Sequence, residues 1–255
     1  MKKHLSVFML ASRFMLWPTV IVSLLGAAAT FTVLMYDFQN LAGAYNAPVL
    51  DGDFFDAAAW PVRIGMLALF ILLTRPLRER GGVQPDYTLR RLRVGELAVF
   101  FWQGLAAAMS LFVFLAFQAA VCFGLGLYLQ NAGYGSSGNM SLIVALVNSP
   151  VAHMLLPLGD WPVYIRLALM LMTLGLSTSY SAFISRMGKT ALSPFALIAL
   201  SLLLLFSDAR TQGVELSIIL LCPVVILCMY ASVRSHIKYD GEPEEAAPAG
   251  GEDLG

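Results

Sequence analysis

Charged residues are scarce in this sequence. Asp, Glu, Lys and Arg together make up 13% of the 255 residues, whereas hydrophobic residues make up 58%. A chain with this ratio cannot hide its apolar surface inside one water-soluble domain of this length. The formal net charge is zero, and no basic stripe with interleaved aromatic residues is present, so nucleic-acid binding is not indicated. The composition therefore predicts a membrane protein.

The short motifs of hydrolytic and metal-dependent enzymes are also missing. The sequence has no HExxH and no GxSxG motif. Residues 188–190 (Gly-Lys-Thr) resemble the end of a phosphate-binding loop, but Phe183 occupies the place of the required leading glycine. The three histidines lie far apart in the chain, at His4, His153 and His236. We expect no catalytic residue, no metal and no cofactor site in this chain.

Cysteine is almost absent. The three cysteines, Cys122, Cys222 and Cys228, all fall inside apolar runs and lack metal-ligand spacing. This pattern predicts buried small hydrophobic residues rather than a disulfide framework or a zinc site.

Long apolar runs are what the sequence does contain. A membrane-spanning helix needs about 20 predominantly apolar residues. The predicted fold is an all-α polytopic membrane domain over 1–239, followed by a disordered cytosolic tail over 240–255, which is rich in Glu, Pro, Ala and Gly. Six spans are predicted, at about 16–36, 59–74, 97–129, 161–185, 191–207 and 214–233.

The positions of Lys and Arg predict the orientation. Most of them lie in four segments that would share one side of the membrane: the start, the loop 75–96, the link 186–189 and the tail. The segment 130–160 on the other side has none. By the positive-inside rule, both termini are predicted to be cytoplasmic.

Two further segments are predicted to be ordered without crossing the membrane. Residues 3–14 mix polar and apolar residues and are predicted to lie along the cytoplasmic interface; the alternative is that they are the start of the first span. The apolar run from Ser141 is interrupted by Pro150 and Pro157, which predicts a re-entrant or interfacial element on the outer side.

Polar residues within the spans are the usual indicators of function in a membrane protein. Arg166 and Glu215 lie near predicted span ends, where interfacial snorkelling is the favoured interpretation. Gln118 lies deeper in the third span and either lines a pathway or hydrogen-bonds to a neighbouring helix. No carboxylate lies near the middle of a span, which disfavours a proton-coupled carrier.

The basic loop contains the most distinctive short stretch, DYTLRRLRVGE. A short amphipathic helix from Asp86 to about Arg93 would put Tyr87, Arg90 and Arg91 on one side. Tyr and Arg often anchor interfaces, so this helix could enter a groove on a cytosolic subunit. The alternative is that the arginines fix the topology and contact anionic lipid.

The order of these parts resembles that of the type-two ABC exporter permeases. Residues 87–92 (Tyr-Thr-Leu-Arg-Arg-Leu) are similar to a Tyr-Thr-Leu-x-Arg-Leu signature at the coupling position of a group of bacterial permease-like membrane proteins. Residues 153–160 (His-Met-Leu-Leu-Pro-Leu-Gly-Asp) resemble a His-x-Leu-Leu-Pro-Leu stretch in the outer loop of that group. Arg93 departs from the proline that tends to follow the signature.

The resemblance implies a permease subunit in a bacterial inner membrane. It implies two permease subunits, identical or related, and two ABC-type ATPase subunits that bind ATP and magnesium and contact the coupling helices. The implied coupling residues are Tyr87, Thr88, Leu89, Arg90, Arg91 and Leu92. The implied outer-gate residues are His153, Leu155, Leu156, Pro157, Leu158 and Asp160, and Gln118 is a candidate pathway residue.

Two other classes of function stay open at the level of sequence. One is a stand-alone channel or carrier whose basic loop only fixes topology, and the other is an assembly or regulatory membrane protein. The substrate is not determined, because lipids, peptides and hydrophobic drugs all suit apolar walls.

Overall fold

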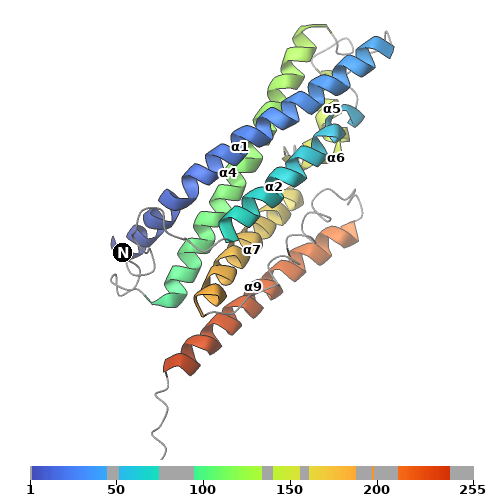
Figure 1. Ribbon diagram of the computed structural model, residues 1–255. Coiled ribbons are helices and arrows are strands. Elements are labelled where there is room, and N and C mark those ends of the chain that lie inside the picture. Colours follow the sequence, from blue (N-terminus) through green and yellow to red (C-terminus); the bar gives the residue numbers. More distant parts are fainter. Residues whose placement is uncertain are drawn as a thin grey trace, which may run out of the picture.

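The computed structural model describes residues 2–44, 52–74, 95–133, 140–155, 161–187, 197 and 212–241, and these residues form an elongated helical bundle (Figure 1). The first half contains α1 (Lys2–Ala44), the 3-10 helix η1 (Gly52–Ala58), α2 (Ala59–Thr74) and α4 (Glu96–Asn131). The second half contains α5 (Met140–Asn148), α6 (Pro150–Leu155), α7 (Trp161–Arg186) and α9 (Gln212–Gly241). No β-strand occurs in these ranges, so the all-α prediction is confirmed there.

Five helices in the described part of the chain are long and apolar enough to cross a membrane. They cover Ser6–Asn40, Phe54–Thr74, Glu96–Asn131, Trp161–Ser185 and Leu216–Ile237. The predicted span 191–207, apart from Leu197, lies outside the described residues, as do the predicted coupling helix and the tail beyond 241.

The first helix corrects one prediction. Residues 3–14 do not form a separate interfacial helix, because they belong to the same continuous α-helix as the first span, which runs through Pro18. Val7, Ala11, Met15 and Thr19 are all buried and follow the helical repeat across the expected break. This continuous stripe lets α1 stay in contact with α4, as the Phe8–Trp102 ring contact (centroids 5.9 Å apart) also shows.

Helix α4 is the centre of the bundle, packing mainly against α1 and α7. It runs parallel to α1, because Phe8 meets Trp102 and Thr30 meets Gln118. It runs antiparallel to α7, because Gly104 meets Leu176 and Phe100 meets Ser179.

Helices α7 and α9 are neighbours that run in the same direction. Cys222 of α9 lies against the side chain of Thr173, and further along both helices the hydroxyl of Tyr180 is 3.1 Å from that of Ser232. Figure 1 shows the two helices descending side by side. The end of α7 and the start of α9 therefore lie at opposite ends of the bundle.

The helices are staggered along the bundle. Gly175 of α7 lies beside Gly104 of α4, and the two helices are antiparallel. Trp161, the first residue of α7, is therefore level with Gln118 of α4. The rest of α4, up to Asn131, therefore extends about 20 Å beyond the start of α7 at the usual helical rise. Helices η1, α5 and α6 pack beside this extension, and we call this end of the bundle the hairpin end (Figure 1).

Candidate functional site

The predicted pathway residue Gln118 is fully buried at the junction of α1, α2 and α4. Its Oε1 accepts a hydrogen bond of 2.7 Å from the hydroxyl of Thr30 on α1. The sequence left two alternatives for Gln118, a pathway-lining position or a hydrogen bond to a neighbouring helix. The structure shows the hydrogen bond to a neighbouring helix. Among the described residues, the Gln118 side chain has no exposed surface.

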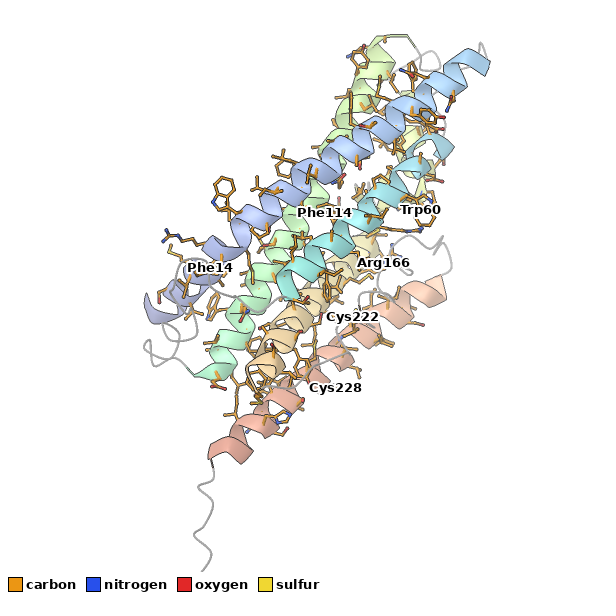
Figure 2. The ribbon with its side chains drawn as sticks, in the orientation of Figure 1. Phe14, Trp60, Phe114, Arg166, Cys222 and Cys228 are labelled. Atoms are coloured by element: carbon orange, nitrogen blue, oxygen red, sulfur yellow. The ribbon has the colours of Figure 1, made fainter. Side chains whose placement is uncertain are left out.

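The same junction contains an aromatic ring held between two glycines. A Cβ atom added to Gly26 of α1 would lie 2.9 Å from Cε2 of Phe114, and one added to Gly65 of α2 would lie 2.6 Å from its Cζ. Any larger residue at either position would collide with the ring. Phe114 therefore fixes the register of three helices at one point, and Figure 2 labels it where they meet.

Two polar atoms on α1 and α4 are buried without a hydrogen-bond partner among the described residues. They are Nε2 of Gln118 and Oγ of Ser23 on α1. Both side chains have no exposed surface. A buried polar group without a partner costs about 1–3 kcal/mol, so such atoms mark a place that something else must satisfy.

A second polar contact ties together the elements at the hairpin end. The hydroxyl of Ser149, between α5 and α6, donates a 2.7 Å hydrogen bond to Oδ1 of Asp56 in η1. Oγ of Ser149 also accepts a 3.3 Å hydrogen bond from the backbone N–H of Ala152 and so caps the start of α6. Pro150 at the first position of α6 suits this break, because it lacks the N–H that a continuous helix would need there.

Helix α5 is apolar on both of its faces. Leu142, Ala145 and Leu146 are buried, and Leu142 packs onto Gly126 of α4. The opposite face exposes three apolar side chains, namely Ile143, Val144 and Val147. With only nine residues α5 is too short to cross a membrane, and its exposed apolar face suits a lipid environment.

Only part of the predicted outer-gate stretch is described. His153 and Leu155 lie on α6 and are half-buried, and α6 packs against η1, α5 and α4. Leu156, Pro157, Leu158 and Asp160 lie outside the described residues, as do the coupling residues Tyr87 to Leu92.

One arginine of the bundle does not follow the expected pattern. Arg166 is only 6% exposed, so its side chain lies within the bundle instead of snorkelling along the lipid-facing surface. Arg63 of α2, which sequence reasoning did not single out, lies 5.6 Å from the ring of the exposed Trp60. The side chain of Glu215 lies outside the described residues.

The middle of α7 is a polar segment that sequence reasoning missed. The buried hydroxyls of Thr173, Ser177 and Thr178 donate hydrogen bonds to carbonyl oxygens of their own helix. Ser179 instead donates a 2.8 Å hydrogen bond to the carbonyl oxygen of Phe100 on α4. The detectable signal was the run Ser-Thr-Ser-Tyr-Ser at 177–181, which begins two residues after Gly175, since small and hydroxyl residues mark helix contacts in membranes.

The cysteine prediction holds for two residues of three. All three cysteines are free thiols; Cys122 and Cys222 are buried, but Cys228 is exposed on α9 (Figure 2). The apolar run therefore placed Cys228 in a long helix without burying it among the described residues.

Comparison of this chain with family models, with curated proteins and with solved structures gave no match.

Proposed function

We propose that this chain is the membrane-spanning permease subunit of an ATP-driven exporter in a bacterial inner membrane. It contributes no catalytic residue, and a separate ABC-type ATPase subunit binds ATP and magnesium and hydrolyses the nucleotide. The observation that carries the proposal is the hairpin α5–Ser149–α6, which lies between two membrane-length helices, is too short to cross, and is bonded to η1 at one end of the bundle. An outer non-spanning hairpin in this position is what the sequence resemblance implies.

The direction of the helices supports six crossings. Because α7 and α9 are parallel neighbours, the end of α7 and the start of α9 lie at opposite ends of the bundle, as one further crossing between them would require. The sequence between these two helices contains the apolar run 191–207. Six crossings place both termini on one side of the membrane, and the positive-inside rule favours the cytoplasmic side.

The ends of α2 and α4 support a cytosolic position for the basic loop. Helix α2 ends at Thr74 and α4 begins at Glu96, and both of these points lie away from the hairpin end. The N-terminus of α1 and the C-terminal end of α9 also lie away from the hairpin end (Figure 1). In the sequence, the loop with Tyr87, Arg90 and Arg91 connects these two helix ends. An ATPase subunit on the cytosolic face would reach this loop directly.

The proposed mechanism is a shift between two arrangements of paired permease subunits. The second subunit is another copy of this chain or a related permease, and the substrate pathway runs between the two. Nucleotide binding closes the ATPase pair. The closed ATPase pair binds one arrangement of the coupling helices more tightly than the other and so favours that arrangement. Residues 87–92 transmit this change, and the hairpin with His153 and Leu155 closes the outer exit.

A pull-down in mild detergent tests the proposal. The native chain is compared with a Tyr87→Ala, Arg90→Glu, Arg91→Glu variant at matched expression and membrane insertion. An Arg78→Glu, Arg80→Glu variant changes the charge of the same loop outside the signature and serves as the control. We expect an ABC-type ATPase to co-purify with the native chain and the control but not with the triple variant.

Absence of an ATPase from all three samples would remove the exporter proposal. Transport by the purified chain alone in liposomes would then favour the stand-alone channel or carrier, with the arginines acting as topology anchors.

A further inference from the structure

The α1–α4 contact contains a site that the exporter proposal does not use. Oε1 of Gln118 on α4 accepts one hydrogen bond, which comes from the hydroxyl of Thr30 on α1. Its amide nitrogen and the hydroxyl of Ser23 are buried, and neither has a partner among the described residues. Gln118 Nε2 lies at the α1–α4 contact beside Gly26, and Ser23 is a fully buried residue of α1.

The position of Gly26 relates these two atoms to each other. Ser23, Gly26 and Thr30 are spaced along α1 so that they share one face of the helix. A Cβ added to Gly26 would lie 2.7 Å from Nε2 of Gln118, so the amide nitrogen lies directly over the glycine. Ser23 is one turn away from Gly26, on the side opposite Thr30, and Cβ positions one turn apart are separated by about 5–6 Å.

The chemistry of the two groups is complementary but their direct bond is not made. A primary amide nitrogen carries two hydrogens and only donates, whereas a hydroxyl oxygen can both accept and donate. A water molecule placed between them would accept from Nε2 and hydrogen-bond to Ser23 Oγ. Internal waters in proteins typically satisfy buried polar groups of this kind.

We propose that one internal water bridges Nε2 of Gln118 and Oγ of Ser23. It joins α4 to α1 about one helical turn from the direct Thr30–Gln118 bond. Gly26 is essential to this arrangement, because a side chain there would displace the amide.

The direct test is an experimental structure of the full chain in lipid nanodiscs at a resolution that shows ordered water. We expect one water oxygen within about 3.2 Å of both Gln118 Nε2 and Ser23 Oγ. A dry contact, or an amide nitrogen bonded directly to a protein oxygen, would overturn the proposal.

A double-mutant cycle gives an independent readout from thermal unfolding in detergent. We expect Ser23→Ala to lower the midpoint by about 2–4 °C in the native chain, which corresponds to about 1 kcal/mol for a chain of this size. The same substitution is expected to have almost no further effect in a Gln118→Met background, because the bridge is already lost there.

Two controls separate the bridge from general weakening of the contact. Thr30→Val removes the direct bond but keeps the amide nitrogen, so Ser23→Ala should retain its effect in that background. Ser110→Ala removes a hydroxyl that bonds within α4, to the carbonyl oxygen of Ala106, and should add independently to Gln118→Met. Additive effects of Ser23→Ala and Gln118→Met would contradict the bridge.

Discussion

At the scale of single residues, Gly175 decides how closely α4 and α7 approach. A Cβ atom at this position would lie 2.6 Å from the backbone nitrogen of Ala108 and 2.8 Å from its Cβ. Gly104 opposite is similarly crowded by Leu176. Small residues at a helix crossing let the backbones touch, and van der Waals contact at such points holds helices together in a membrane.

Substitution of Gly175 should therefore lower the free energy of unfolding. We expect Gly175→Ala to destabilise the chain by about 1–3 kcal/mol, because the added methyl group overpacks the crossing. The measurement is thermal unfolding of the purified protein in detergent. Gly124→Ala on α4 is the matched control: the added methyl group meets nothing within 4 Å, and the change should leave stability unaltered or raise it by up to about 1 kcal/mol, because Ala suits a helix interior better than Gly. Equal effects of the two substitutions would show that the crossing tolerates a side chain.

At the scale of elements, the hairpin end depends on Ser149. This residue ends α5, accepting through its carbonyl the first hydrogen bond of α6 from His153 N–H, while its side chain bonds Asp56. Loss of the hydroxyl removes both the bond to Asp56 and the cap of α6.

We expect Ser149→Ala to loosen α6 without unfolding the spans. The lost cap and the lost bond are each worth about 1 kcal/mol. Hydrogen exchange followed by mass spectrometry should show faster exchange in residues 150–155 and unchanged exchange in α4 and α7. Ser12→Ala, which removes an exposed hydroxyl bonded to its own helix, should leave all of these rates unchanged. Unchanged exchange in α6 would show that apolar packing alone holds the hairpin.

At the scale of the whole molecule, the two ends of the bundle should face opposite sides of the membrane. Helix α4 ends at the hairpin end, whereas α9 ends at the other. We expect Ser137→Cys, in the segment that joins α4 to α5, to react with a membrane-impermeant maleimide added to intact cells. Ser235→Cys near the end of α9 should react only after the cells are permeabilised.

Both variants are made with Cys228→Ser, because Cys228 is the exposed cysteine within the described residues. A chain that carries only Cys228→Ser shows the background from Cys122 and Cys222. Labelling of both new cysteines in intact cells would contradict the six-crossing topology. Labelling of Ser235→Cys alone would reverse the orientation.

The sequence by itself determined the class of the molecule and the places of its described long helices. Whether about 20 consecutive residues are apolar is a local property, and it is readable without knowing which helices are neighbours. The break at Pro150 was readable for the same reason, since proline disturbs the helix in which it lies.

Only the tertiary structure decided how these helices meet. The bond from Thr30 to Gln118 joins residues 88 positions apart, and that from Ser149 to Asp56 joins residues 93 apart. Such pairs depend on the rotation and register of whole helices, which apolar runs leave undetermined because lipid and protein interior accept the same side chains. The continuity of α1 was decided in the same way: packing of its buried stripe against α4 outweighed the local signals that suggested a break.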